Sequence, residues 1–212
     1  ARLAVAIADR IHQLCGKGFP VEMRMVGDEV HPGGYHIEEG IRQAQLLDGH
    51  ADLIHVSTGD HNSDAFMRTH PSMFLPDACN LEFAAAIKKE VKTPVATVGA
   101  LGDPEMLEDI IASGKADFVN MARQLLCDPD LPNKARAGKE DEIIRCMRCL
   151  ACFSGLLNQG QFHCAINPEI GRELEYSIPA PIGEKKTVLV AGGGVGGMQA
   201  ALTAAERGHK VI

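Results

Sequence analysis

The chain has 212 residues, 45% of them hydrophobic and 23% charged, which is typical of a soluble globular protein with room for one large or two small domains. Its net charge of −7 argues against a general nucleic-acid-binding surface, because such a surface needs a basic face. No apolar run reaches the length of a membrane span.

Strands and helices alternate along the first part of the chain, after an opening segment with apolar residues at helical spacing. The helix after Asp103 carries clear boundary signals, with Asp103 as N-cap, Pro104 at the first position and Gly114 just past the end. A long loop rich in His, Asn, Ser and Pro is expected over 57–80. Strands are expected at 21–26, 51–56, 94–99 and 116–121, and helices at 37–47, 81–91 and 104–113.

Short apolar strands separated by helices predict parallel pairing through right-handed crossovers. Two architectures fit, an open doubly wound sheet or the C-terminal half of a (β/α)8 barrel, since a full barrel needs about 250 residues. Gly99 ends the third strand and Arg123 follows the fourth, and the last loops of such barrels commonly bind a phosphate. Arg24 is expected to point into the mouth of the same barrel, with a rim salt bridge as its alternative role.

Four of the seven cysteines follow the spacing C-x2-C-x2-C-x11-C. Three closely spaced thiolates and one distant thiolate are typical of a 4Fe–4S cluster. Structural zinc is the main alternative, although zinc ribbons usually bring two separated CxxC pairs. A disulfide framework is disfavoured because nothing else marks a small secreted scaffold. The candidate ligands are Cys146, Cys149, Cys152 and Cys164, whereas Cys15, Cys79 and Cys127 are interpreted as free thiols. Ligand thiolates and free thiols in one chain together predict a reducing, cytoplasmic compartment.

A glycine-rich turn follows a strand expected over 187–191 and contains G-x-G-x-x-G as Gly192, Gly194 and Gly197. An Ala-rich helix over 198–207 and the start of a second strand come next. This strand–turn–helix–strand context indicates a Rossmann-like site for the pyrophosphate of a dinucleotide, with a glycine turn of no function as the alternative. The acidic residue that binds the ribose is expected beyond Ile212, so FAD and NAD(P) both remain open.

Half barrel, four-cysteine loop and dinucleotide turn, in that order, resemble the multi-cofactor branch of the old yellow enzyme flavoproteins. That branch includes bacterial 2,4-dienoyl-CoA reductase, enoate reductases and trimethylamine dehydrogenase. The resemblance covers essentially the whole chain. Besides the cysteine loop it is carried by VEMRMVGDE, ADLIHVSTG, PVATVGALGDPE, ADFVNMARQLLCDPDLPNKARAG, INPEIGRE and VLVAGGGVGGMQAA.

The resemblance implies a segment of a longer protein in three parts: half of an FMN-binding barrel over 1–141, a 4Fe–4S segment and linker over 142–184, and the start of an FAD/NAD(P)-binding domain over 185–212. By position, Arg24 corresponds to an arginine near the flavin ring. The FMN phosphate loops correspond to Gly99, Ala100, Ala122 and Arg123, the cluster ligands to Cys146, Cys149, Cys152 and Cys164, and the ADP-binding turn to Gly192, Gly194 and Gly197.

One departure concerns the two-residue gap between Cys149 and Cys152. The dienoyl-CoA reductases tend to carry one more residue there, whereas trimethylamine dehydrogenase has the shorter gap, so the substrate is not indicated. The family's proton donors would precede residue 1, and no catalytic residue is assigned. His55, His61 and His70 lie on or after the second strand, but a lone histidine is more often a solvated or hydrogen-bonded residue than a catalyst.

The resemblance implies an NAD(P)H-dependent oxidoreductase in which electrons pass through FAD and the cluster to FMN, which reduces the activated C=C bond of a small unsaturated substrate. A first alternative is an amine dehydrogenase that passes electrons out to a partner electron-transfer flavoprotein. A second is a zinc-stapled scaffold that binds nucleotides without catalysis. Neither a nucleic acid nor a membrane is an expected partner, and a homo-oligomer is left open.

Overall fold

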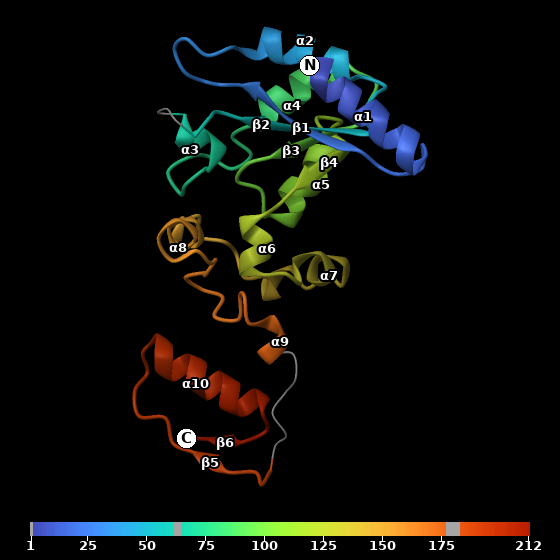
Figure 1. Ribbon diagram of the computed structural model, residues 1–212. Helices are drawn as coiled ribbons and strands as arrows, with labels where there is room; N and C mark the ends of the chain where they lie inside the picture. Colours follow the sequence, from blue (N-terminus) through green and yellow to red (C-terminus); the bar gives the residue numbers. More distant parts are fainter. Residues whose placement is uncertain (1, 62–64, 177–182) are drawn as a thin grey trace. The chain divides into compact units, whose positions relative to one another are not determined.

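The computed structural model describes residues 2–61, 65–176 and 183–212 (Figure 1). The chain divides into two compact units, Ala1–Ile170 and Gly171–Ile212. Among the described residues, no helix combines the length and the apolar character that crossing a bilayer requires.

The first unit contains the four strands and the helices between them that the sequence predicts, with shifted ends. The strand expected at 51–56 begins at Leu53, and the Asp52 carboxylate just before it accepts the backbone N–H of Val21 at 2.8 Å. A helix that begins just before the third clustered cysteine, Cys152, was not predicted. The elements are α1 (Arg2–Cys15), β1 (Glu22–Asp28), α2 (Ile37–Leu47), β2 (Leu53–Thr58), α3 (Phe66–Thr69), α4 (Leu81–Lys88), β3 (Val95–Val98), α5 (Pro104–Ala112), β4 (Phe118–Asn120), α6 (Arg123–Cys127), α7 (Leu131–Arg136), a 3-10 turn (Glu140–Glu142) and α8 (Ala151–Gln159).

The strands form one parallel sheet in the order β1-β2-β3-β4, which is also their order along the chain. Right-handed crossovers in this consecutive order place every connecting helix on the same face of the sheet. A doubly wound sheet would reverse its strand order and carry helices on both faces. The observed order therefore fits part of a (β/α)8 barrel.

The helix-facing side of the sheet forms the main hydrophobic core. Ile54, Val56 and Val95 are fully buried there, against apolar residues of α2 and α4. Figure 1 shows α1, α2 and α4 along this side of the sheet. A second cluster packs α5 against Val119 of β4. Val119 pairs in register with Thr97, and Thr97 lies on the same face of β3 as Val95. The helix α5 therefore covers the same face of the sheet as α2 and α4.

The opposite face of the sheet is polar and concave. His55 Nδ1 lies 2.7 Å from Glu22 Oε1 and 3.0 Å from Asn120 Nδ2, and Asn120 donates to Glu22 at 3.4 Å. Glu22 and Asn120 come from the two edge strands, which a flat sheet would hold about 14 Å apart. Their contact requires the sheet to curl, as the wall of a barrel does.

The second unit contains α9 (Glu173–Tyr176), β5 (Thr187–Val188), α10 (Val195–Glu206) and β6 (Lys210–Val211). The two strands pair in parallel on either side of the glycine-rich turn, as the sequence predicts. α10 begins three residues earlier than expected, so Gly196 and Gly197 lie in its first turn.

The burial pattern predicts a contrast between two isoleucines. Ile54→Ala should lower the free energy of unfolding by about 2–5 kcal/mol, because it leaves a cavity in the main core. Ile7→Ala, at a position of α1 with 48% of its surface exposed, should cost about 0.5 kcal/mol or less. Urea denaturation followed by circular dichroism measures both, and equal losses would contradict the assigned core.

Candidate cofactor-binding site

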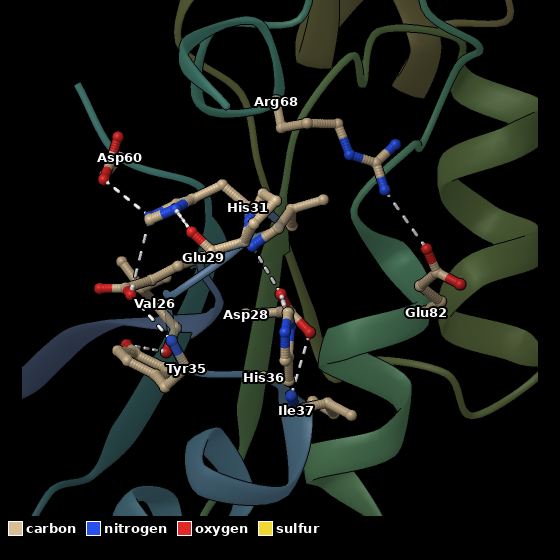
Figure 2. Close-up of polar contacts among 12 residues, drawn as sticks. Val26, Asp28, Glu29, His31, Tyr35, His36, Ile37, Asp60, Arg68 and Glu82 are labelled. Carbon is tan, nitrogen blue, oxygen red and sulfur yellow. Dashed lines mark hydrogen bonds and ion pairs between the residues drawn. The ribbon is translucent and has the colours of Figure 1, made fainter. Parts of the chain in front are cut away.

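Polar contacts hold the loops at the carboxyl ends of β1 and β2 (Figure 2). The Asp28 carboxylate accepts the backbone N–H of Ile37 at 3.0 Å and lies 3.3 Å from His36 Nδ1, which anchors the start of α2. The Tyr35 hydroxyl donates to the Val26 carbonyl oxygen at 2.8 Å. In the loop after β2, the Arg68 guanidinium pairs with Glu82 at 3.4 Å. These loops therefore have defined positions at the edge where a barrel carries its active site.

A cavity of about 660 Å³ opens at this edge, beside the loops after β3 and β4. The five residues predicted to contact FMN come from β1 and from the segments that follow β3 and β4, yet all line this cavity. They are Arg24, Gly99, Ala100, Ala122 and Arg123.

The loop after β3 has a backbone that most residues adopt only with strain. Gly99 has φ +126°, and a Cβ there would stand 2.5 Å from the side-chain nitrogen of the buried Asn80. Ala100 also has a positive φ, of 53°. Its carbonyl oxygen accepts the N–H of Ala78 at 3.2 Å, which holds the loop in place. Glycine at position 99 is thus required by the close approach of Asn80.

Arg123 is the first residue of α6, is half-buried and lines the cavity with its cation. Among the described residues its Nη1 is buried and has no hydrogen-bond partner. A buried guanidinium N–H without an acceptor is costly, and a phosphate oxygen in the cavity would satisfy it. This orphaned donor fits the phosphate group of FMN.

His70 lies beside the same cations but is itself neutral at pH 7. Burial, followed by the positive charges of His61, Arg123 and Arg24, lowers the pKa of His70 to about 4. Its ring centroid lies 4.4 Å from that of Phe153 on α8, and its Nε2 lies 3.0 Å from Nε2 of His61. The structure thus places two of the three histidines noted in the sequence together near the cavity, whereas His55 lies on the concave face of the sheet.

The four clustered cysteines surround a second, smaller cavity, which is lined by Cys146, Cys149, Cys152 and Cys164 together with Arg123 and neighbouring apolar residues. Arg123, Cys146 and Cys152 also line the large cavity, so the two cavities share a wall.

The cysteine loop has features that suit a cluster. The backbone N–H of Arg148 donates to Cys146 Sγ at 3.4 Å, and Arg148 and Leu150 on either side of Cys149 have positive φ values of 54° and 62°. Across the described ranges, no three His, Cys, Asp or Glu side chains converge closely enough to hold one metal ion. Four thiols that line one cavity provide the number of thiolate ligands that a 4Fe–4S cluster requires, and four thiolates are also a zinc ligand set.

Two buried side chains clamp the segment that leads into the cysteine loop. The Gln124 carboxamide donates to the Ile144 carbonyl oxygen and accepts the N–H of Cys146, both at 2.9 Å. The Asp128 carboxylate accepts the N–H of Ile144 at 2.9 Å and pairs with Lys134 at 2.7 Å. Both side chains belong to α6 or to the residue directly after it, so the cysteine loop is fixed to the helix that carries Arg123.

Two arginines of the cysteine loop reach other loops at the same end of the sheet. Arg145 forms an ion pair with Asp103, the N-cap of α5, and Arg148 pairs with Asp77 at 3.4 Å. The pKa of the Asp103 carboxyl is lowered because backbone N–H groups and Arg145 outweigh the effect of burial. These pairs tie the loop to the segments that follow β2 and β3.

Cys127 is a residue whose position the sequence did not indicate. It is only 2% exposed and donates to the Ile144 carbonyl oxygen at 3.4 Å. Burial, together with the nearby thiols of Cys164 and Cys146, raises the pKa of Cys127 to about 12. Its spacing from the other cysteines follows no ligand motif, so only the fold brings it to the cluster loop.

The predicted dinucleotide turn lies in the second unit. Gly192 has φ +128°, and a Cβ on Gly197 would stand 1.9 Å from the Gly192 carbonyl oxygen. Gly194 is the N-cap of α10 and has no side chain to satisfy the first N–H groups of that helix. The turn therefore leaves the backbone accessible to a pyrophosphate, which fits the dinucleotide interpretation.

Comparisons with known proteins give consistent matches. The profile of the NADH:flavin oxidoreductase / NADH oxidase family matches residues 1–142. The chain is 41% identical to an NADH oxidase from Thermoanaerobacter brockii, over 100% of this chain and 33% of that protein. It is 36% identical to a cinnamate reductase from Clostridium sporogenes, over 99% of this chain and 34% of that protein.

Among solved structures, a 2-naphthoyl-CoA reductase in complex with 2-naphthoyl-CoA matches with a TM-score of 0.88 at 30% identity. The match covers 98% of this chain and 32% of that one. The chain thus spans about a third of the length of each of these three proteins.

The buried Arg123 Nη1, which has no acceptor among the described residues, predicts that this arginine contributes to the affinity for FMN. Arg123→Gln should weaken FMN binding by about 10- to 100-fold, the equivalent of one hydrogen bond to a charged group. Titration of the flavin-free full-length protein with FMN, followed by flavin fluorescence, measures this change. Arg136→Gln, at an exposed cation of α7, is the matched control and should bind as the parent does. Equal affinity in both variants would contradict a phosphate at Arg123.

The Asp128 clamp predicts a pH-dependent loss of stability. Although burial acts to raise it, Lys134 and the N–H groups of Ile144 and Asp130 lower the pKa of the Asp128 carboxyl below its ordinary value of 3.8. The ionised clamp therefore contributes stability above about that pH and loses it as the pH falls through the lowered pKa.

We expect Asp128→Asn to lower the free energy of unfolding at pH 7 by about 1.5–3 kcal/mol, because it removes a charge-assisted contact with Lys134. Thermal unfolding of parent and variant between pH 7 and pH 3 measures the difference, which should shrink in the acid range. The exposed Asp141→Asn serves as control, and a difference independent of pH would count against the ionised clamp.

Proposed function

The chain belongs to the NADH:flavin oxidoreductase / NADH oxidase family, and from this premise we propose that it is part of an iron–sulfur flavoprotein that uses NAD(P)H to reduce an activated C=C bond. The observation that carries the proposal is the wall shared by the two cavities of the first unit. The large cavity is lined by arginines, and the Nη1 of one of them, Arg123, is a buried donor with no acceptor among the described residues. This cavity meets the cavity lined by four thiols at Arg123, Cys146 and Cys152.

The first unit's residues would hold two groups. Arg123 would bind the FMN phosphate, with the backbone of Gly99, Ala100 and Ala122 beside it, and Arg24 would place a positive charge near the flavin ring. Cys146, Cys149, Cys152 and Cys164 would ligate a 4Fe–4S cluster. When bound, FMN would supply hydride chemistry toward the substrate, and the cluster and FAD would supply electron transfer from NAD(P)H.

The residues around these groups would set their spacing. The Gln124 and Asp128 clamp fixes the cysteine loop to α6, and the Arg145 and Arg148 ion pairs fix it to the loops after β2 and β3. Because electron transfer between bound groups depends on their separation, such fixed anchoring suits a relay. The glycine turn at Gly192, Gly194 and Gly197 would bind the pyrophosphate of FAD.

The substrate class is proposed from the relatives. The cinnamate reductase and the 2-naphthoyl-CoA reductase are named for a conjugated acid and an aromatic thioester. We therefore propose an unsaturated acid or thioester, small enough to reach the large cavity, as the substrate. Thiolate ligands together with unpaired thiols at Cys15, Cys79 and Cys127 support a reducing, cytoplasmic compartment as part of the proposal.

Metal and acid-labile sulfide analysis of the anaerobically purified full-length protein tests the cluster. We expect about four iron and four sulfide per chain. Cys149→Ala should lower this content, whereas Cys15→Ala, at an exposed thiol of α1, should leave it unchanged. Zinc without sulfide would contradict the proposal and favour a zinc-stapled scaffold.

The reaction is tested separately, with NADH or NADPH as the sole electron donor and cinnamate as acceptor under anaerobic conditions. Oxidation of the nicotinamide coupled to loss of the C=C absorbance is the expected result. Oxidation of an amine with an artificial acceptor, and no turnover with either nicotinamide, would instead indicate an amine dehydrogenase.

A further inference from the structure

The chain that follows the fourth clustered cysteine is held by a side chain. Among the described residues, no backbone–backbone hydrogen bond involves residues 161–170. Asn167, three positions after Cys164, instead donates from Nδ2 to the carbonyl oxygen of Leu126 at 2.8 Å. This contact joins the segment after the cysteines to α6, across 41 positions of the sequence.

Both polar atoms of the Asn167 amide have a suitable partner. The helix α6 ends at Cys127, so the Leu126 carbonyl oxygen lies in its last turn, where backbone acceptors have no partner within the helix. Asn167 Oδ1 accepts the backbone N–H of Glu169 at 3.0 Å, which fixes the orientation of the amide within its own turn. The Nδ2 group is therefore directed to α6 and satisfies an acceptor that the helix itself leaves open.

The same helix holds the other end of the cysteine segment. Gln124, two positions before Leu126, accepts the N–H of Cys146 at 2.9 Å. The first three clustered cysteines follow one another at two-residue gaps, whereas Cys164 comes only after eleven further residues. One tight loop therefore places the first three thiols, but the fourth thiol depends on contacts made outside that loop.

The contact between Asn167 and Leu126 lies at the wall of the four-thiol cavity. Leu126, Ala165 and Ile166 line this cavity together with Cys164, and Asn167 is the next residue of the chain. Fixing Asn167 to Leu126 therefore fixes the stretch of wall that carries the fourth thiol.

We propose that Asn167 is a positioning residue for the fourth cluster ligand: its amide holds Cys164 against α6 and keeps the Cys164 thiolate on iron. The inference rests on the proposed function, because it needs a cluster at the four cysteines. Without the amide contact, the segment after Cys164 gains conformational freedom, which must be lost again each time the thiolate binds iron. The Cys164 thiolate would then leave the cluster more readily than the other three.

The order in which the thiols leave the cluster tests this role. The anaerobically purified full-length protein is incubated with an iron chelator and iodoacetamide, and peptide mass spectrometry follows the alkylation of each cysteine. A thiolate bound to iron is protected, whereas a released thiolate is a nucleophile and is alkylated.

The parent is compared with Asn167→Asp, which has no amide donor, and with Asn167→Gln, which retains one. Asn158→Asp is the matched control, because Asn158 Nδ2 also donates to a backbone carbonyl oxygen, that of Ser154 at 2.9 Å, but within α8.

In Asn167→Asp, the rate of alkylation at Cys164 relative to the other three clustered cysteines should rise about 10-fold, the equivalent of one hydrogen bond. Asn167→Gln should lie between this variant and the parent, and Asn158→Asp should match the parent. An unchanged ratio in Asn167→Asp would overturn the proposal. Equal acceleration at all four cysteines would overturn it as well, since it would indicate a general loosening of the loop.

The iron and sulfide content of each protein is measured first. An Asn167→Asp variant that is folded by circular dichroism, yet holds less iron than Asn158→Asp, would support the positioning role. A parent without iron and sulfide would defeat the proposed function, and this inference with it, whereas an unchanged ratio in a loaded protein would defeat this inference alone.

Discussion

The buried carboxamide of Gln124 is the contact on which the site depends. It joins the main chain on both sides of Arg145, by donating to the Ile144 carbonyl oxygen and accepting the N–H of Cys146. Because both partners are backbone groups, the clamp fixes the path of the chain and not only one side chain. The four-cysteine loop therefore begins at a defined point against α6.

The short helix α6 carries a residue that lines both cavities of the first unit. Arg123 at its first turn lines both cavities, and Cys127 four residues later donates to the Ile144 carbonyl oxygen just before the cysteine loop. Residues four apart lie on the same helix face, so both side chains point toward the cysteine loop. Gln124, next to Arg123, faces the segment before that loop. A change in the position of α6 would thus move the proposed phosphate site and cluster site together.

The curl of the sheet brings the strand ends together. Glu22, His55 and Asn120 meet on the concave face, while the apolar side chains of the same strands face the helices. This two-sided pattern places the carboxyl ends of the strands around one mouth, where Arg24, Gly99 and Arg123 line a single cavity. The polar inner face and the cavity therefore have a common cause in the barrel-like curvature.

The sequence by itself determined the local elements and the motifs. Apolar periodicity and cap residues such as Asp103 place the strands and helices, because hydrophobic spacing and capping act over a few residues. The cysteine spacing and the glycine turn are likewise local signals. Tertiary structure decided between the barrel and the doubly wound sheet, since strand order depends on pairings distant in the chain. It also decided the place of Cys127, whose hydrogen bond to the Ile144 carbonyl oxygen spans 17 positions that no local pattern encodes.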